Sequence, residues 1–331
     1  MHEKKVAMQE IADKLHISKG SVFKALSNRT DISLELREKI LRTATKLGYV
    51  IEDPLFKLCK KVYFIISQKF VFSTEQFYSK IYRKISQKFE KIKIETIFMP
   101  ISDNITDYQL LQQIQIERKI GVIIAGSTQQ AVLNFLVKKS IPYISIDNYL
   151  ENHGGNYIYI DDYHSGYIIT NYLIKKGHKK IDFFVSLEAS NNLDKYFGYK
   201  KALIENNLDN GVSKHHDVDL SVMSNFSNFV FPSELPDAFL FQSDHAAANF
   251  MLVAYNNGYK IPKDFSIASF DNTDICLETT PRLTSIGPNY EELCNVCYDN
   301  LLFRFTKRNT GPQLTILSSN IIVGESIKER K

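Results

Sequence analysis

The sequence predicts a small all-α domain at the N-terminus, followed by a larger α/β core built from two doubly wound parallel sheets. Its 331 residues exceed what one hydrophobic core comfortably holds, so more than one folding unit is expected. Apolar residues recur at helical spacing over the first fifty positions. Beyond Lys61, short apolar strands alternate with amphipathic segments, as in parallel sheets covered by helices. We therefore expect a helical domain over residues 1–50, a hinge over 51–61 and a core over 62–331.

The first fifty residues have the spacing of a helix-turn-helix. A tight interruption at residues 16–18 separates two sets of helically spaced apolar residues: Ile11, Ala12, Leu15 and Ile17, then Val22, Ala25 and Leu26. Ser18 is placed to cap the second helix, which leaves the first turn of that helix exposed. A third helix is expected from Ser33 to a stop at Gly48. Three short helices in this order predict a helix-turn-helix unit.

The positive charge of the chain is concentrated in the same region. Residues 1–61 hold 13 Lys and Arg against 8 Asp and Glu, a net charge of +5, whereas the remaining 270 hold 28 against 29, a net charge of −1. The phosphate backbone of nucleic acid attracts such a surface, although a basic surface also serves solubility. The charge distribution therefore favours a nucleic-acid partner for the N-terminal domain.

The core contains two successive series of strands. The expected strands span residues 62–67, 93–99, 121–126 and 142–147 in the first series, and 157–161, 180–186, 238–242 and 265–271 in the second. Two such series imply two similar lobes. We expect lobe 1 to take in about 62–159 and 288–317, and lobe 2 about 160–287 and 318–331.

Neither membrane insertion nor export is supported by the sequence. No apolar run approaches the roughly 20 residues that span a bilayer, and the N-terminus has no apolar region typical of a signal peptide. The four cysteines are too few and too unevenly spaced for a disulfide framework. We therefore expect a cytoplasmic protein with no membrane association.

Catalytic and metal-binding motifs are not evident. Cys294 and Cys297 form a C-x-x-C pair without a second pair or a nearby His, which favours buried core residues over a metal or redox site. The adjacent carboxylates Asp161 and Asp162 are expected to point in opposite directions at a strand end, and residues 215–216 to lie in a loop. There is no phosphate-binding loop, H-E-x-x-H motif or nucleophile elbow. The sequence therefore predicts no enzyme, no cofactor and no metal.

Residues 6–49 resemble the DNA-binding domain of the lactose-repressor (LacI/GalR) family. The resemblance rests on VAMQEIADKLHISKGSVFKALSNRTDISLELREKILRTATKLGY, through its I-A, I-S, S-V and A-L pairs, D-I-S, R-E-K-I and the final L-G-Y. In that family the second helix enters the major groove of DNA. The resemblance implies DNA contacts by Ser18, Lys19, Gly20, Ser21, Lys24, Asn28 and Arg29. Lys24 occupies a position where the family usually has Arg, and either side chain can donate to guanine O6 and N7.

The N-terminal domain departs from the family pattern at two positions. His16 stands at the turn, where the family favours Gly, and His tolerates a left-handed backbone with some strain. Ala7 replaces the usual Thr cap of the first helix, which should cost roughly 1 kcal/mol. Neither change is expected to prevent folding.

The hinge departs further. The family forms a short helix whose Leu wedges into the minor groove, and Leu58 of VIEDPLFKLCKK aligns with that wedge. Ile51 replaces the family Pro, and Glu52 and Asp53 place negative charge near DNA phosphates. Pro54 can open a short helix as its first residue. An unstructured tether is the alternative.

The resemblance extends through the core, in segments that keep the family order. They are IDDYHSGYIITNYLIKKGHKKIDFF, with Asp162, Gly166, Gly177 and His178, the pair Gly198 and Tyr199, PDAFLFQSDHAA, and GYKIPKDFSIASFDN followed by PRLTSI. The resemblance implies the two-lobed core of periplasmic sugar-binding proteins, with a ligand held between the lobes. Such sheets bind ligands beyond the carboxyl ends of their strands.

The effector residues are expected at those strand ends and on the facing helices. The strand ends carry Ser67, Gln68, Asp147, Ser243, Asp244 and Asp271. Lys195 stands where the family presents Arg to its effector, and Phe77 is placed to cover a sugar face. Asp147 and Asp271 are the strongest candidates, because carboxylates accept hydrogen bonds from hydroxyl groups. Lys195 loses the bidentate fork of Arg and would suit a phosphorylated ligand.

These features predict a DNA-binding transcriptional regulator, expected to be a repressor. The family implies a homodimer on a pseudo-palindromic double-stranded DNA operator, controlled by a small-molecule effector such as a carbohydrate or a phosphorylated derivative. Two alternatives remain open. One is a small-molecule binding protein whose DNA binding is vestigial, and the other is a regulator whose core answers to a protein corepressor.

Overall fold

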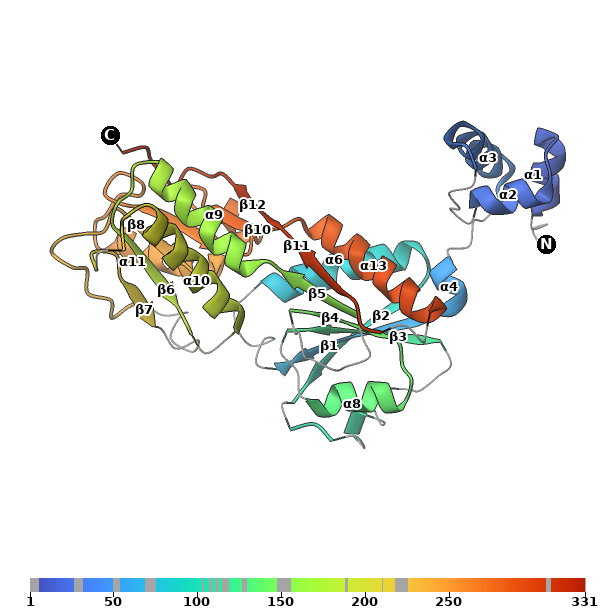
Figure 1. The fold of residues 1–331 in the computed structure, drawn as a ribbon, viewed down its shortest axis with the longest axis horizontal. Coiled ribbons are helices and arrows are strands. Elements are labelled where there is room, and N and C mark those ends of the chain that lie inside the picture. The colour runs from blue at the N-terminus through green and yellow to red at the C-terminus, as the bar shows by residue number, and fades with distance from the viewer. Residues whose placement is uncertain are drawn as a thin grey trace.

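The fold is known from a computed structural model, which describes residues 6–26, 32–49, 54–68, 76–102, 104–106, 109–110, 113–114, 119–126, 130–147, 156–187, 190–209, 211–217, 226–307 and 311–330. Figure 1 shows three helices standing apart from a larger α/β core. They are α1 (Met8–Leu15), α2 (Lys19–Leu26) and α3 (Leu34–Leu47). Their shared core is formed by Ile11, Ala12, Val22, Ala25, Ile40 and Ala44. The helix-turn-helix predicted from the sequence is therefore present.

A five-residue helix, α4 (Pro54–Leu58), precedes the core and begins at Pro54, as the sequence allowed. Leu55 of α4 and the following Cys59 are fully buried in the first hydrophobic cluster of the core. The same cluster takes in Leu301 of the long helix α13 (Tyr290–Thr306). The described part of the hinge is thus a helix that packs on the core.

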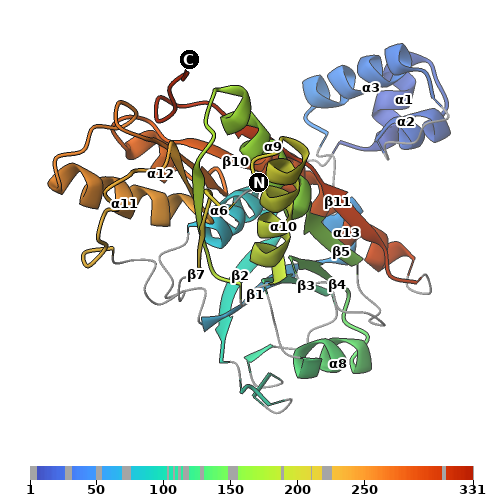
Figure 2. The ribbon, with the colours of Figure 1, turned by 60° about the vertical axis from the view of Figure 1, so that its left-hand side comes forward.

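The first sheet and its helices form lobe 1. Its strand order is β11-β5-β4-β3-β1-β2, and all neighbours are parallel. The strands are β1 (Lys61–Ser67), β2 (Glu95–Ile101), β3 (Ile120–Ala125), β4 (Tyr143–Ile146), β5 (Asn156–Ile160) and β11 (Leu314–Leu317). Helices α6 (Phe77–Lys91) and α13 cover one face, and α8 (Gln130–Lys138) covers the other, as Figures 1 and 2 both show.

The second sheet and its helices form lobe 2. Its order is β12-β10-β9-β8-β6-β7, parallel throughout except for the antiparallel edge strand β12. The strands are β6 (Ile181–Val185), β7 (His215–Asp217), β8 (Ala238–Phe241), β9 (Ser266–Phe270), β10 (Thr284–Pro288) and β12 (Ser319–Ile322). Helices α9 (Asp162–Lys175) and α10 (Ser190–Glu205) cover one face, and α11 (Asp244–Asn256) covers the other. A short helix, α12 (Ile275–Glu278), packs beside α11.

The chain passes between the lobes three times. It leaves lobe 1 between β5 and α9, returns between β10 and α13, and leaves again between β11 and β12. The last connection is a single residue, Ser318. Strand ends that the sequence separates widely therefore meet along one seam.

Close packing of α9 on α10 depends on two glycines. A Cβ atom on Gly166 would lie 2.1 Å from the carbonyl oxygen of Lys195, and one on Gly198 would lie 2.0 Å from that of Tyr163. Neither position has room for a larger residue. The two glycines therefore allow α10 to pack directly against α9, and this packing sets the position of Lys195.

Several details differ from the expectations. Residues 157–161 begin the second predicted series, but β5 pairs with β4 in lobe 1. His215 and His216 lie in β7 instead of a loop, because this edge strand pairs with the buried β6. Asp161 and Asp162 do not end a strand: Asp161 caps α9 through its side chain, and Asp162 begins that helix. Cys294 and Cys297 are buried within lobe 1, as predicted.

No helix in the described ranges is long and apolar enough to cross a membrane.

Candidate DNA-binding surface and effector site

The turn between α1 and α2 has the geometry expected from the sequence. His16 adopts a left-handed backbone with φ of 55°, and its amide and that of Ile17 donate to carbonyls at the end of α1. At the other end of α1, the Glu10 carboxylate accepts from the amide of Ala7 at 3.0 Å. This contact satisfies one of the free amides that a Thr cap would not reach, and so supports α1 despite Ala7.

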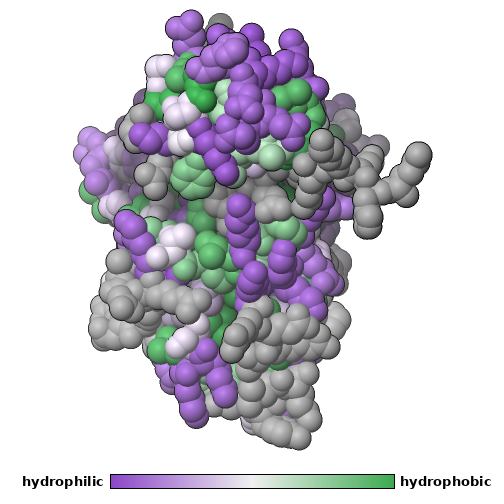
Figure 3. Space-filling model, turned by 90° about the vertical axis from the view of Figure 1, so that its right-hand side faces the viewer, coloured by the Kyte–Doolittle hydropathy of each residue, from purple (hydrophilic) through white to green (hydrophobic). Residues whose placement is uncertain are grey.

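The first turn of α2 is capped and exposed. The Ser18 hydroxyl accepts from the amide of Ser21 at 3.0 Å, and the two hydroxyls lie 2.9 Å apart. Ser18, Lys19 and Gly20 are exposed, while Ser21 and Lys24 are half-buried. Figure 3 views the molecule from the end that carries α1–α3, whose surface there is mostly hydrophilic. Asn28 and Arg29 lie outside the described residues.

One exposed residue of α2 was not predicted as a contact. Phe23 is 48% exposed, although it lies between the buried Val22 and the predicted DNA contact Lys24. An apolar side chain on a helix that enters the major groove can contact the methyl group of thymine. The position of Phe23 next to Lys24 is the feature of the sequence from which this contact could have been predicted.

Leu58 does not have the exposed position that a minor-groove wedge requires. It is half-buried and packs against the lobe 1 cluster that also holds Leu55 and Cys59. In this conformation α4 is docked on the core, so Leu58 is directed to protein. A contact with DNA would require α4 to leave that surface.

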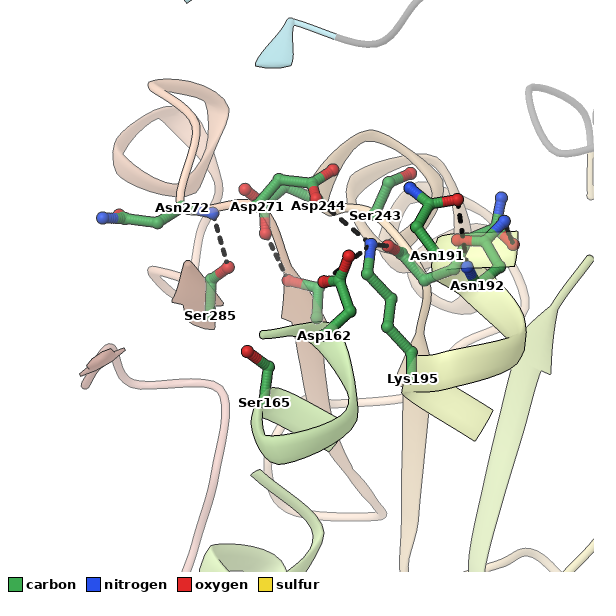
Figure 4. A network of polar contacts seen from close by, with 12 residues as sticks. Asp162, Ser165, Asn191, Asn192, Lys195, Ser243, Asp244, Asp271, Asn272 and Ser285 are labelled. Atoms are coloured by element: carbon green, nitrogen blue, oxygen red, sulfur yellow. Dashed lines mark hydrogen bonds and ion pairs between the residues drawn. The ribbon is translucent and has the colours of Figure 1, made fainter. Parts of the chain in front are cut away.

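Three of the predicted effector residues meet where the lobes face each other. Lys195 of α10 is 5% exposed, and its ammonium lies 3.5 Å from Oδ1 of Asp271 and 4.0 Å from Oδ1 of Asp162 (Figure 4). It also donates to the carbonyl of Gln242 at 3.2 Å. Asp147, at the end of β4, interacts electrostatically with both Lys195 and Asp162. We call Asp147, Asp162, Lys195 and Asp271 the charge cluster.

The backbone at the two strand-end carboxylates is unusual. Asp147 has φ of 57° and Asp271 has φ of 99°, both in the region that favours glycine. Such conformations persist where the surrounding structure enforces them, often at binding sites. The backbone of Asp271 packs closely on Gly287, because a Cβ atom on Gly287 would lie only 2.6 Å from it.

Burial changes the ionisation of the cluster. Burial raises the pKa of Asp147 to about 6, and the nearby Lys195 opposes the shift. Burial likewise raises the pKa of Asp162 well above its usual range, again against the effect of Lys195, and Asp147 and Asp271 add to the increase by repulsion. With all three carboxylates ionised, the charge cluster would carry more negative charge than its single ammonium group can balance, and the raised pKa values reflect that strain.

Comparison with known proteins places these features in a family. A family model described as a periplasmic binding protein-like domain matches residues 170–327. The NTD biosynthesis operon regulator NtdR of Bacillus subtilis (strain 168) is 26% identical over 288 residues, covering 84% of this chain and 86% of that protein. The lac repressor dimer bound to operator and an anti-inducer superposes with a TM-score of 0.61 at 17% identity, covering 98% of this chain and 99% of that one.

A further relative aligns along nearly the whole chain. The ribose operon repressor of Haemophilus influenzae (strain ATCC 51907 / DSM 11121 / KW20 / Rd) is 22% identical over 330 residues, covering 98% of this chain and 99% of that protein. The aligned part thus includes both the helix-turn-helix and the two lobes. The relatives and structural neighbours of this chain are LacI-family transcriptional regulators. Its relatives are regulators and not enzymes, which confirms both predictions at the level of the family.

Four predicted effector residues are engaged inside their own lobes. Asp244 is fully buried and accepts from the hydroxyls of Ser269 and Thr273 and from the amide of Thr273, at 2.6 to 2.9 Å. Ser243 caps α11 through its side chain. Phe77 is 8% exposed and packs on Tyr290 in the lobe 1 cluster, and Ser67 is 2% exposed in β1. These side chains make contacts within their own lobe. Gln68, in contrast, is exposed.

Two residues at or beside the charge cluster were not predicted as effector contacts. Asp162 entered the sequence comparison only as a landmark, yet its carboxylate lies beside Lys195. Gln242 joins Asn192 and the backbone of Ser186 through its side-chain oxygen and binds Lys195 through its carbonyl. Asp162 could have been predicted as the second carboxylate of the I-D-D sequence, because it is the first residue of α9.

Proposed function

We propose that the chain acts in the cytoplasm as a homodimeric repressor, whose affinity for a pseudo-palindromic DNA operator changes when a small carbohydrate binds between its lobes. The proposal is carried by one observation: an exposed, capped recognition helix is joined through α4 to a core whose lobes meet at a buried charge cluster. We take residues 1–50 as the DNA-binding domain, 51–61 as the hinge and 62–331 as the effector core.

Direct DNA contacts are assigned to α2. The exposed Lys19 and Gly20 and the half-buried Ser21 and Lys24 lie on its first two turns. Lys24 is the residue best suited to read a guanine, and Lys19 the one best suited to a phosphate. Phe23 adds an apolar contact to a thymine methyl group.

The effector is assigned to the charge cluster. Asp147 belongs to lobe 1, whereas Asp162, Lys195 and Asp271 belong to lobe 2. A ligand that bonds to both sets draws the lobes together, because each bond is complete only in one relative position. The ribose operon repressor among the relatives supports a carbohydrate as the ligand class.

A dimer surface is assigned to α11 and α12. Leu252 and Tyr255 of α11 and Leu277 of α12 are 64%, 76% and 70% exposed. The two helices contact each other, so these exposed apolar side chains come from neighbouring elements of lobe 2. Apolar patches of this kind mark protein interfaces. A dimer sets two recognition helices at the spacing of two half-sites.

The structure offers a route from the effector to the DNA. Lys80 of α6 donates to the carbonyl of Asn272 at 2.7 Å and pairs with Asp274 at 3.0 Å, so helix α6 of lobe 1 is tied to lobe 2 next to Asp271. The opposite end of the same lobe 1 cluster holds α4. Movement of the lobes would therefore change the surface on which the hinge helix rests.

Selection of DNA from a random pool tests the proposal. The full-length protein is incubated with random duplexes, bound sequences are recovered and read, and the affinity of the consensus is measured over a range of salt concentrations. We expect a pseudo-palindromic consensus with two half-sites and a binding advantage of at least a thousandfold over random DNA. Recovery of no consensus, with only salt-sensitive binding, would overturn the proposal.

A further inference from the structure

The charge cluster holds more carboxylates than a neutral or anionic ligand requires. The carboxylates of Asp162 and Asp271 lie within 4.0 Å of the Lys195 ammonium, and that of Asp147 is close enough to interact with it electrostatically. Asp194 stands next to them, joined by a hydrogen bond to the hydroxyl of Tyr159, and adds to the repulsion on Asp162. With all carboxylates ionised, the site lacks positive charge, and Lys195 is already engaged by its neighbours.

Asp147 shows that one acceptor has been left for a ligand. Among the residues that the structure describes, none bonds to its Oδ1, although that atom is closed off from solvent. An unpaired buried acceptor is costly, and one that persists in a native protein points to strain, to a functional role or to a bound water, ion or ligand. Asp147 has a left-handed backbone, and its carboxylate lies close enough to Lys195 and Asp162 of lobe 2 to interact with both electrostatically.

We propose that the effector is a polyhydroxylated molecule that carries a protonated amine, and that its ammonium group binds between Asp147 of lobe 1 and Asp162 of lobe 2. The inference rests on the proposed function and specifies the ligand of the same site. The amine replaces the missing positive charge and donates to Oδ1 of Asp147. Because its two partners lie on different lobes, the same group that gives affinity also closes the lobes.

The same geometry disfavours a phosphorylated effector. The sequence suggested a phosphorylated ligand because Lys195 is a cation at the expected site. In the structure, however, its ammonium lies 3.5 and 4.0 Å from two carboxylates. A phosphate placed there would meet like charges at short range, which disfavours its binding in a buried site. Lys195 is better described as a fixed counter-ion that allows the carboxylates to gather.

Matched sets of sugars test the inference. Glucosamine, galactosamine, mannosamine and 3-amino-3-deoxyglucose are each compared with the parent hexose and with the hexose 6-phosphate, by thermal shift and titration calorimetry on the full-length protein. We expect at least one amine to raise the melting temperature and to bind about tenfold or more tightly than its parent, a difference typical of one charged hydrogen bond. The phosphates should not bind.

Two variants separate the ammonium contact from simple loss of fold. Asp147→Asn keeps the shape and tolerates the left-handed backbone, and it should lower the affinity for the amine about tenfold more than it lowers the affinity for the parent hexose. Asp209→Asn is the matched control, because Asp209 pairs with Lys200 on the far part of lobe 2 and loses the same charge. Thermal melting without ligand checks that both variants are folded.

The outcomes are distinct. A hexose or phosphate that binds as tightly as its amine, stabilisation by calcium or magnesium chloride alone, or failure of every amine to bind would overturn the inference. Operator selection is run on the same preparation. A palindromic consensus without amine binding would reject the amine and leave the proposed regulator intact, whereas absence of a consensus would reject the regulator itself.

Discussion

The hydroxyl of Tyr290 donates a 2.6 Å hydrogen bond to the backbone carbonyl of Asp271, the residue whose carboxylate faces Lys195. Tyr290 is the first residue of α13, and α13 packs on the hinge helix α4. The bond thus links the charge cluster to the helix that supports the hinge.

Tyr290→Phe removes this link without removing the ring that packs on Phe77. We expect the ratio of operator affinities with and without effector to fall several-fold, while effector affinity changes little. The unpaired carbonyl should also cost about 1 kcal/mol of stability. Fluorescence anisotropy on labelled operator measures the ratio, and Tyr163→Phe on the exposed face of α9 is the control. An unchanged ratio would contradict a role for Tyr290 in coupling.

Lys24→Ala tests base reading by α2. Loss of a contact to a base edge should weaken binding to the selected operator by roughly 1 to 3 kcal/mol, with effector affinity intact. The charge-matched control is Lys46→Ala on the exposed end of α3. Gel-shift titrations on operator and random DNA give both affinities. Equal losses on the two DNAs would show that Lys24 contacts phosphate only.

Leu252→Lys places a charge on the α11 and α12 surface. Because this surface is proposed to be buried between two copies, the variant should elute as a monomer and lose most of its operator affinity. Sedimentation velocity gives the mass. Val230→Lys, at a residue that is 85% exposed outside α11 and α12, is the control. A dimeric Leu252→Lys protein would place the dimer interface elsewhere.

The raised pKa of Asp147 gives stability a defined dependence on pH. The folded protein holds this proton up to about pH 6, whereas the unfolded chain releases it near 3.8, so stability should fall as pH rises between these values. The groups that act on Asp147 are Lys195, the backbone of Ile160 through a hydrogen bond, and Asp162, and Asp147 in turn acts on the Tyr159 hydroxyl.

Asp147→Asn should remove that fall and stabilise the unliganded protein at pH 7 by about 1 to 3 kcal/mol. Asp274→Asn should act in the opposite direction, because hydrogen bonds from Arg83 and Lys80 hold the pKa of Asp274 below its usual range. Melting curves from pH 4 to pH 8 compare the two variants. A destabilised Asp147→Asn protein at pH 7 would mean that the carboxylate is already compensated.

Gly166→Ala tests the close contact of α9 with α10. Its Cβ would collide with the carbonyl of Lys195, so α10 must shift, at a cost of about 2 kcal/mol. Gly311→Ala, where nothing described lies within 4 Å, should be neutral. Urea denaturation gives both values. Effector affinity should fall with Gly166→Ala as Lys195 is displaced.

The predictable parts of the fold have local signals. The N-terminal helices carry their own caps and stops, such as Ser18 and Gly48, and their apolar spacing is regular. The buried strands of both sheets appear as short apolar runs. Strands β10, β11 and β12 were not predicted, because β10 contains Gly287 and Pro288 and the other two are partly exposed edge strands. Tertiary pairing, which the sequence does not display, gives these segments their structure.

The candidate site was predictable only in part, for a geometric reason. The rule that ligands bind at strand ends identified Asp147 and Asp271, and the family position identified Lys195. The same rule also selected Asp244 and Ser243, which turn inward to Ser269, Thr273 and the start of α11. Asp147 and Asp271 have positive φ whereas Ser243 has φ of −145°, and no periodicity in the sequence reports such backbone angles.

The three chain crossings between the lobes have a consequence for engineering. Each lobe is assembled from separated segments, so exchanging one lobe for that of a relative would need three simultaneous splices, all at the seam that carries the charge cluster. The helices α1–α3 are joined to the core by one stretch of chain, and a single junction near α4 exchanges them. In a biosensor built on this protein, the DNA-binding domain can therefore be exchanged at one junction to recognise a new promoter. Its effector specificity, in contrast, has to be changed by substituting individual residues.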